Sequence, residues 1–380
     1  MKILLVTEFF PTGRDLRFSG GVEARTYYVA KHLTKNHQVS VLASVSPGTK
    51  SREKLSNIDV FRVGPARNYS ASVGHLISRI KFIKNAIEFG SGINADIVEG
   101  GNYISHFIAK SIAQRKKIPA VAWYPDVWLG DWIKNATFYG VFGEILERYN
   151  LFRGFDAYIA ISKKTQTLLS KYTKTKVHLI YCGVDYQEFF KRGNKFQKPV
   201  ILCISRLASY KNIKTLVLAF ANLSRSLPNI DLQIVGEGPE EKNLKNLVGN
   251  LKITSKVKFH SNLPRKDLIA LIKSSYVFCL PSKVEGFGIV TIEAASAGIP
   301  YVNSNIPVHV EVTKRGMGGF LADPDSPIDF SNKLSKLLSN KQLYLRKSQQ
   351  ARQLSKIYDW SQIAYQTEQV YKNIFKFSKI

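Results

Sequence analysis

The stretch PSKVEGFGIVTIEAASAGIP, residues 281–300, decides the fold because it joins a buried strand to a helix through a glycine-bearing loop. An apolar run at residues 276–280 precedes it and predicts a strand of a parallel sheet. Residues 289–297 follow a helical pattern, which Gly298 and Pro300 end. Free backbone N–H groups at such a helix N-terminus, together with the positive end of the helix dipole, favour a bound phosphate.

Two carboxylates flank this loop, Glu285 within it and Glu293 about one turn into the helix, with seven residues between them. A carboxylate accepts hydrogen bonds well from two neighbouring hydroxyl groups of a sugar or ribose ring. A plain strand–loop–helix junction with solvated glutamates explains the same residues. The residues alone therefore leave both interpretations open.

The segment EGFGIVTIE, residues 285–293, resembles the E-x7-E motif of the GT-B glycosyltransferases, most closely the family 4 group of retaining enzymes. The resemblance implies that Glu293 holds the ribose of a sugar nucleotide and that Glu285 contacts the donor sugar. It also implies that the loop between them meets the diphosphate and the sugar. The loop residues with this implied role are Gly286, Phe287, Gly288 and Ile289.

A pair of cations, Arg206 and Lys211, follows the strand predicted at residues 200–205. Fixed cations stabilise the negative charge that develops on a departing nucleoside diphosphate, and arginine suits a planar phosphate edge. Among 55 basic residues such a pair also arises by chance. Its position matches the diphosphate-binding arginine and lysine of the resembled family. A later loop with Gly236 and Gly238 matches the glycine loop near the donor in that family.

The first half of the chain begins with a strand, a glycine loop and a helix, which predicts a doubly wound unit. The ligand site of such a unit lies at the carboxyl ends of its strands. Gly20 and Gly21 open a helix predicted at residues 22–34. Two glycines alone are a weak indication, but the resembled family places this loop at the donor phosphates and the acceptor.

The segment IPAVAWYPDVW, residues 118–128, predicts a strand followed by a loop that contains Asp126. The resembled family usually has a histidine directly before this aspartate, and that histidine touches the donor sugar, whereas this chain has Pro125. Asp126 could accept a proton from an acceptor hydroxyl, hold a sugar hydroxyl, or serve only as a turn residue. His106, in a helix predicted at residues 104–114, is expected to be a surface or core histidine rather than a replacement.

Length and composition are compatible with two domains, since 44% of the 380 residues are hydrophobic. The sequence has no run of about 18 apolar residues, so we expect no membrane span. The pattern of the N-terminus predicts a first strand rather than a signal peptide. Three separate cysteines in apolar strands indicate free thiols in a reducing cytosol. The Asp-x-Asp pair at residues 323–325 predicts a turn and a helix N-cap, so we expect no metal site.

The chain is strongly basic, with 55 Lys+Arg against 28 Asp+Glu and a formal net charge of +27. This excess indicates nucleic acid, an anionic membrane surface or phosphorylated substrates as partners. Residues 72–90 predict a helix with Ile77 and Ile80 on an apolar face and Arg79 and Lys81 on a basic face. The helix is either an ordinary surface helix or one that rests on anionic lipid.

We therefore predict an α/β chain of GT-B architecture, with two Rossmann-like doubly wound domains that face one another across a cleft. The expected bounds are 1–190 for an acceptor domain, 191–358 for a sugar-nucleotide-binding domain, and 359–380 for a C-terminal helix that returns to the first domain.

The resemblance implies a retaining transferase that moves a sugar from a nucleoside-diphosphate sugar to a hydroxyl, without a metal or another cofactor. The charge favours a lipid-linked or glycolipid acceptor, with the enzyme in the cytoplasm at the inner face of the membrane. Two alternatives remain. One is a basic nucleic-acid-binding protein, although no known nucleic-acid motif is visible, and the other is a sugar-nucleotide epimerase of the same fold.

Overall fold

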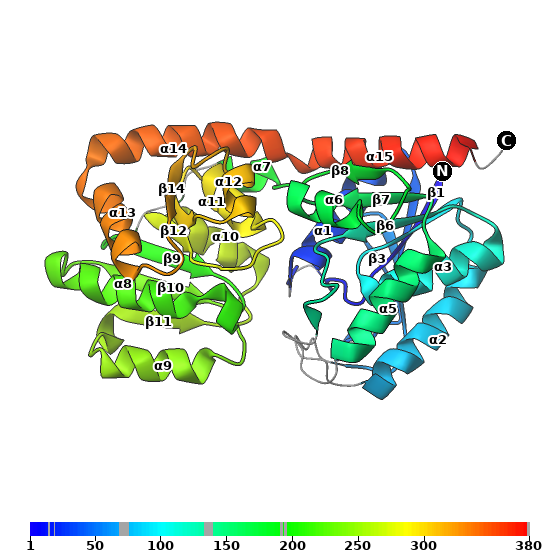
Figure 1. Cartoon of the computed structure of the whole chain (residues 1–380), viewed down its shortest axis with the longest axis horizontal. Helices are drawn as coiled ribbons and strands as arrows, with labels where there is room; N and C mark the ends of the chain where they lie inside the picture. The colour runs from blue at the N-terminus through cyan, green and yellow to red at the C-terminus, as the bar shows by residue number, and fades with distance from the viewer. Residues whose placement is uncertain are drawn as a thin grey trace. The chain divides into compact units, whose positions relative to one another are not determined.

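The computed structural model describes residues 1–13, 16–18, 20–67, 76–132, 140–190, 193 and 196–377. The chain divides into two compact units (Figure 1). Unit 1 comprises Met1–Cys182 and Trp360–Ile380, and unit 2 comprises Gly183–Asp359. The units therefore meet in sequence after Cys182, whereas the sequence analysis placed this boundary after residue 190. The short helix α7 (Tyr186–Phe190) accounts for the difference, because it packs on two helices of unit 2.

Unit 1 is built on a sheet whose described strands have the order β3-β4-β2-β1-β5-β6-β7-β8. Neighbouring strands are parallel except for the antiparallel pair β3–β4. The chain reverses its direction of winding at β1, which pairs with β2 on one side and β5 on the other. Ligands of open α/β sheets bind at such a switch point, outside the carboxyl ends of the strands. The strands are β1 (Lys2–Val6), β2 (Gln38–Ser44), β3 (Arg52–Leu55), β4 (Ile58–Val63), β5 (Ile97–Gly100), β6 (Ala120–Tyr124), β7 (Ala157–Ala160) and β8 (Val177–Leu179).

Helices cover this sheet, and α2, α3 and α5 lie side by side along it (Figure 1). The predicted helices near residues 22–34 and 104–114 are present as α1 and α3, within a few residues of their expected bounds. The described helices of unit 1 are α1 (Gly21–Leu33), α2 (Leu76–Gly92), α3 (Tyr103–Lys116), α5 (Gly140–Arg153), α6 (Lys163–Leu169) and α15 (Trp360–Phe377).

The prediction for α2 was right about the helix and partly wrong about its faces: Ile83 and Ile87 pack on the core and Lys81 and Lys84 are exposed, as expected, but other residues differ. Ile77 is 71% exposed and Ile80 51% exposed, whereas Arg79 is only 7% exposed and Phe82 is fully buried. Periodicity placed the arginine on the solvent side, but a buried carboxylate, Glu8, pairs with it and draws it inward. Residues 72–75 of the predicted segment lie outside the described residues.

The C-terminal helix α15 packs on α1 and so completes unit 1. The Trp360 ring stacks on Tyr28, with 5.5 Å between the ring centroids. The Tyr371 hydroxyl donates a hydrogen bond of 2.6 Å to Glu99 Oε2. Glu99 also pairs with the buried guanidinium of Arg25, so α15 contributes to a buried polar cluster at the centre of the unit.

Unit 2 is built on a parallel sheet whose described strands have the order β11-β10-β9-β12-β13-β14. Chain direction again changes at its centre, because β9 pairs with β10 on one side and with β12 on the other. The strands are β9 (Val200–Ile204), β10 (Asp231–Val235), β11 (Val257–His260), β12 (Val277–Leu280), β13 (Tyr301–Ser304) and β14 (Gly319–Ala322).

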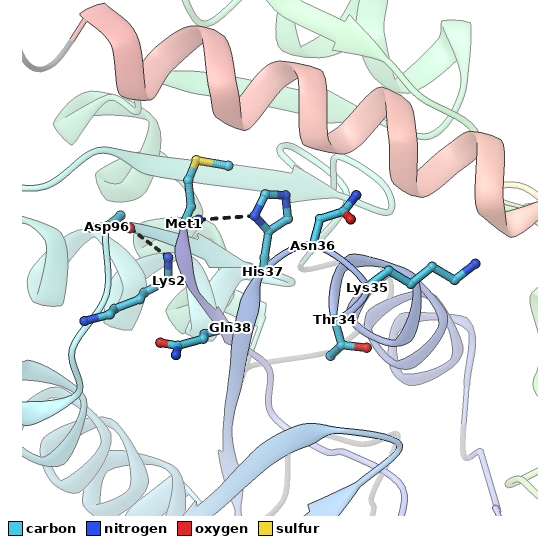
Figure 2. A pocket seen from close by; sticks show the side chains of 8 residues that line it. All are labelled: Met1, Lys2, Thr34, Lys35, Asn36, His37, Gln38 and Asp96. Carbon is cyan, nitrogen blue, oxygen red and sulfur yellow. Dashed lines mark hydrogen bonds between the residues drawn. The ribbon is translucent and has the colours of Figure 1, made fainter.

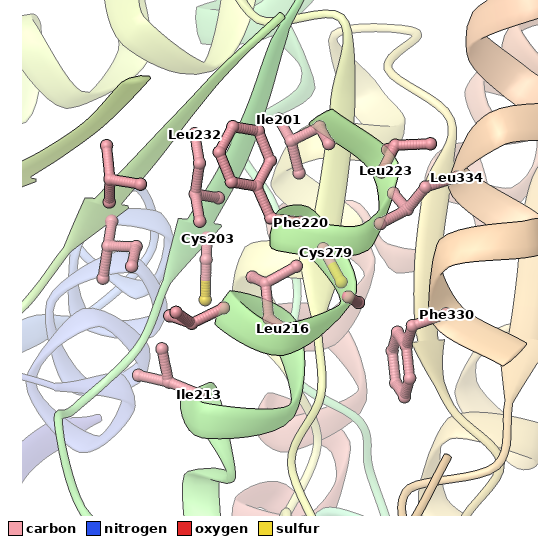
Figure 3. Packing of buried hydrophobic residues seen from close by; sticks show 14 of the residues in the cluster. Ile201, Cys203, Ile213, Leu216, Phe220, Leu223, Leu232, Cys279, Phe330 and Leu334 are labelled. Carbon is pink, nitrogen blue, oxygen red and sulfur yellow. The ribbon is translucent and has the colours of Figure 1, made fainter. Parts of the chain in front are cut away.

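The core of unit 2 lies between this sheet and the helices α8 and α13 (Figure 3). Phe220 of α8 and Phe330 of α13 are fully buried against it, and Cys203 and Cys279 are buried free thiols, as predicted. Burial raises the pKa of Cys203 to about 12, which suits an inert core residue. The helices are α8 (Ile213–Ser226), α9 (Glu241–Asn250), α10 (Arg265–Ser274), α11 (Ile289–Ser296), α12 (Pro307–Val312), α13 (Pro327–Ser339) and α14 (Lys341–Ser355), together with α7.

Candidate functional site

The junction from β12 to α11 has the form that the sequence predicts. The strand ends at Leu280 and the helix begins at Ile289, after a loop of eight residues, 281–288. Gly288 precedes the helix with φ 83°, in the left-handed region that favours glycine. Gly288 has no side chain that could cap α11, so a ligand can approach the positive end of the helix dipole.

Lys211 and Glu285, which the sequence analysis singled out in separate loops, form an ion pair. Lys211 Nζ lies 2.7 Å from Glu285 Oε2, and each side chain is 14% exposed. Burial favours the neutral form of Glu285, but the adjacent Lys211 ammonium, together with His309 and side-chain hydrogen bonds, outweighs burial and holds the pKa of this carboxyl below its usual range. The structure therefore places a cation and an ionised carboxylate together at the carboxyl ends of β9 and β12.

Backbone and amide contacts align the two loops that carry this pair. The Asn212 side chain donates to Pro281 O at 3.1 Å and to Pro324 O at 2.8 Å. The Lys283 amide donates to Tyr210 O at 2.9 Å. These bonds connect the two neighbours of Lys211 with residues shortly before Glu285 and so hold the two loops together.

The loops after β9 and β10 pack backbone to backbone. A Cβ on Gly236 would lie 1.9 Å from Ser205 O, and one on Gly238 would lie 2.3 Å from Leu207 O. Both glycines therefore allow close approach of the loop that carries Arg206. The sequence predicts a role in substrate binding for both glycines and does not indicate this packing role.

Glu293 is buried and belongs to an ion cluster that the sequence analysis missed. Its Oε1 lies 2.7 Å from Arg265 Nη2, and the same nitrogen lies 3.1 Å from Glu188 Oε2. Glu293 is only 5% exposed. The three residues come from α11, α10 and α7, and their separation in sequence leaves no short motif by which to find them.

His309 is a second residue that the sequence analysis did not assign to the site. Its Nδ1 lies 2.9 Å from Ser304 O, and because a carbonyl only accepts, this nitrogen carries the proton. The other nitrogen, Nε2, is buried without a hydrogen-bond partner among the described residues. It lies 3.6 Å from the position that a Cβ on Gly288 would occupy, so the imidazole borders the Glu285–Gly288 loop.

Unit 1 places Asp126 at the carboxyl end of β6, as predicted. Asp126 Oδ1 accepts from the Val127 amide at 2.9 Å and lies 3.7 Å from Lys164 Nζ, so it has both a turn contact and a nearby cation. Gly20 is the extended N-cap residue of α1, and Gly21 is the first residue of that helix.

His106 is a core residue, one of the two roles expected for it. Its imidazole is 1% exposed, and Nε2 lies 2.9 Å from the carbonyl oxygen of Trp123. Burial lowers the pKa of His106 to about 4 and keeps the ring neutral. It therefore does not replace the histidine that Pro125 displaces.

The Asp-x-Asp pair forms a turn, as predicted. The Asp325 amide donates to Asp323 Oδ1 at 3.0 Å, and Ser326 caps α13 by accepting from the Asp329 amide. Groups of three or more potential metal-ligating His, Cys, Asp or Glu side chains are absent from the part of the chain that the structure describes.

Figure 2 shows a surface pocket in unit 1 away from all these residues. It lies at the amino ends of β1 and β2, where the Lys2 amide donates to Asp96 Oδ2 at 2.7 Å. Ligands of doubly wound sheets bind at the opposite edge, so this pocket is not the candidate site. Its lining residues are Met1, Lys2, Thr34, Lys35, Asn36, His37, Gln38 and Asp96.

The chain has two doubly wound α/β units, which is the architecture of the GT-B glycosyltransferases. Its second unit has a Lys–Glu pair beside a glycine loop and a helix N-terminus. The model of Glycosyltransferase Family 4 matches residues 19–188, and that of Glycosyl transferases group 1 matches residues 185–354. The chain belongs to these glycosyltransferases, and the prediction from EGFGIVTIE is confirmed at this level.

One relative is similar to this chain in sequence, and two solved structures are similar to it in fold. An uncharacterized glycosyltransferase of Haemophilus influenzae is 36% identical over 166 residues, which span 43% of this chain and 46% of that protein. Sucrose-phosphate synthase from Thermosynechococcus elongatus has a TM-score of 0.83 at 18% identity and covers 99% of both chains. Anabaena HepE, in complex with UDP and glucose, has a TM-score of 0.75 at 19% identity and covers 98% of this chain and 100% of its own. The structural likenesses confirm the predicted fold.

Proposed function

We propose that this glycosyltransferase moves a hexose from a nucleoside-diphosphate sugar to an acceptor hydroxyl, with retention of the anomeric configuration. The observation that carries the proposal is the Lys211–Glu285 pair beside Gly288 and the N-terminus of α11. The cation and the backbone N–H groups at the helix end suit a diphosphate, and the carboxylate suits the hydroxyl groups of a sugar. The presence of UDP and glucose in the complex of Anabaena HepE supports this donor class.

The ion pair has a direct role in this reaction. Without a donor, Lys211 and Glu285 satisfy each other at 2.7 Å. A bound diphosphate takes over the Lys211 ammonium, which then stabilises the charge on the departing oxygen together with Arg206. Glu285 becomes free to accept hydrogen bonds from the sugar hydroxyls. Because these fixed cations supply the positive charge, we propose that transfer is independent of a metal or another cofactor.

Glu293 would bind the ribose of the donor. Arg265 holds Glu293 Oε1, which orients the carboxylate while its other oxygen accepts from a ribose hydroxyl. The cost of burying Glu293 is offset by that same guanidinium, since a buried charge costs less free energy when an opposite charge lies beside it. The proposed reaction requires no side-chain nucleophile. The diphosphate departs from, and the acceptor attacks, the same face of the sugar, so the anomeric configuration is retained.

Replacement of Asp126 by asparagine tests the acceptor side of the proposal. We expect transfer to slow by about 10²-fold, as for the loss of a general base, while the dissociation constant of the nucleoside diphosphate stays the same. Transfer and nucleotide binding should be measured on the same preparation. Normal turnover would return Asp126 to the role of a turn residue, which its bond to the Val127 amide already fits.

We propose that the enzyme acts in the cytoplasm on a lipid-linked or glycan acceptor and rests on the inner face of an anionic membrane. The helices α2 and α5, on either side of α3, expose large apolar side chains: Ile77 at 71%, Ile145 at 62% and Phe152 at 88%. Exposed Lys81 and Lys84 lie on α2, so apolar insertion and attraction to anionic lipid would act together. No helix of the described chain has the length and apolar content to cross a bilayer.

Sedimentation with vesicles tests this membrane proposal. We expect the protein to sediment with vesicles of phosphatidylcholine and phosphatidylglycerol, less so at high salt, and weakly with phosphatidylcholine alone. A variant with Ile77→Ser and Phe152→Ser should lose most of this binding. Ile328→Ser, which removes a residue 66% exposed on α13 of unit 2, is the matched control and should bind as the unchanged protein does. Equal binding to both vesicle types would contradict the proposal.

A further inference from the structure

Two buried arginines of unit 1 share one carboxylate. Arg67 Nη1 lies 2.6 Å from Glu8 Oε1, and Arg79 Nε lies 3.1 Å from the same oxygen. The three residues are buried, with Arg67 5%, Arg79 7% and Glu8 7% exposed. The other carboxylate oxygen, Glu8 Oε2, accepts from Asn102 Nδ2 at 3.4 Å.

The Arg67 guanidinium retains unused donors. Arg67 Nε and Arg67 Nη2 are buried and have no hydrogen-bond partner among the described residues. Arg67 otherwise lies over the rings of Phe9 and Phe82, with distances of 4.6 and 5.5 Å from its Cζ to the ring centroids. Aromatic faces attract the cation but accept no strong hydrogen bond, so these N–H groups are left to a further acceptor.

The cluster also carries an unbalanced charge. Two guanidiniums against one carboxylate give a formal charge of +1 in a buried setting. Burial of a charge without a counterion is costly, and the cost falls when an anion completes the cluster. Arginine recognises the planar edge of a carboxylate or a phosphate through two parallel N–H groups. A small anionic group therefore fits both the free donors and the excess charge.

The position of the cluster connects it with substrate binding. Glu8 follows β1, Arg67 follows β4, and Asn102 follows β5, so all three stand at the carboxyl edge of the sheet, next to its switch point. A Cβ on Gly101, beside Asn102, would lie 3.6 Å from Val22 Cγ1. Val22 directly follows the Gly20–Gly21 pair, and Gly101 thus connects the cluster to the loop for which the resemblance implies contact with the donor phosphates and the acceptor.

We propose that Arg67 and Arg79 bind an anionic group, a phosphate or a carboxylate, of the acceptor that receives the sugar. The identity of this anion as part of an acceptor rests on the proposed transferase function. Glu8 aligns the two guanidiniums in the absence of substrate and competes with the incoming anion for their donors.

Calorimetric titration with inorganic phosphate and, separately, with succinate tests this site. The chain should carry Arg206→Ala and Lys211→Ala, so that the predicted diphosphate cations do not contribute. We expect one of the two anions to bind with one site per chain, and the anion that binds identifies phosphate or carboxylate as the group recognised. Arg67→Gln should weaken this binding about tenfold or more.

Glu8→Gln provides the opposite and more discriminating change. Because it removes the competing carboxylate and keeps the side-chain size, it should tighten anion binding about tenfold. Arg67→Gln could fail to fold, and the Glu8→Gln variant then still tests the site. The rise in melting temperature that the same anions produce is a second measure of binding. Arg148→Gln, whose side chain is 60% exposed in the same unit, should bind as the background chain does.

Two results would overturn the proposal: neither anion binds to the background chain or its Glu8→Gln variant, or a folded Arg67→Gln variant binds as tightly as the background. Titration of UDP into the Arg67→Gln variant, with Arg206 and Lys211 intact, tests separately whether the protein binds the nucleotide of the proposed donor. Anion binding without any nucleotide binding would keep the arginine site and remove its interpretation as part of an acceptor site.

Discussion

Replacement of Lys211 by alanine is expected to lower donor turnover by about 10²- to 10³-fold, the range found when one group that stabilises developing charge is removed. Lys211 is the cation held closest to Glu285, and the Asn212 amide bonds fix the loop that carries it. Its loss leaves the departing diphosphate with less compensation and leaves Glu285 without its charge partner. Release of nucleoside diphosphate at saturating donor measures the effect.

Lys214→Ala is the matched control for this prediction, because Lys214 is an exposed lysine only three residues away on α8. Its turnover should match that of the unchanged enzyme. Lys211→Arg keeps the charge but changes its geometry, and should recover part of the rate. Full activity of Lys211→Ala would remove the Lys211–Glu285 pair from the mechanism.

Replacement of Arg25 by alanine is expected to destabilise unit 1 by about 3–5 kcal/mol, as for breakage of a buried ion pair. Arg25 is 1% exposed, pairs with Glu99 and lies with its Cζ 4.8 Å from the centroid of the Trp123 ring. Its removal leaves Glu99 as a buried carboxylate without its charge partner, although the Tyr371 hydroxyl still donates a hydrogen bond to it. Chemical denaturation followed by tryptophan fluorescence measures the change.

Arg148→Ala makes the same truncation at the surface. Arg148 forms an i,i+4 pair with Glu144 and is 60% exposed, so its loss should cost about 0.5 kcal/mol or less. Equal effects of the two arginine variants would contradict the central role given to the Arg25–Glu99–Tyr371 cluster, and with it the account of how α15 joins unit 1.

Patterns in the sequence predicted those structural features that depend on residues close to one another in the chain. The strand, the glycine loop and the helix around Glu285 follow from apolar runs and helix punctuation, and the structure has them where expected. Lys211 was predicted as a site residue because it comes shortly after the first strand of the second unit. In the structure it contacts Glu285. Parallel strands bring such loops to one edge of a sheet, which makes this kind of site predictable.

Contacts between residues distant in sequence escaped prediction. Arg265, Glu188 and Glu293 meet only because three helices pack together, and no spacing in the chain marks them. The burial of Arg79 was not predicted for the same reason. A charged residue in an amphipathic pattern is expected to face solvent, but the distant Glu8 makes its burial possible.

Calorimetric titration of the protein with UDP, GDP, ADP and CMP tests the central claim most directly, with Arg206→Ala/Lys211→Ala as the comparison. Our account predicts saturable binding of one nucleoside diphosphate, with one site per chain, that the double variant loses. No binding of any of these nucleotides to the unchanged protein, or equal binding to both proteins, would contradict a donor site built on Arg206, Lys211 and the Glu285–Glu293 segment.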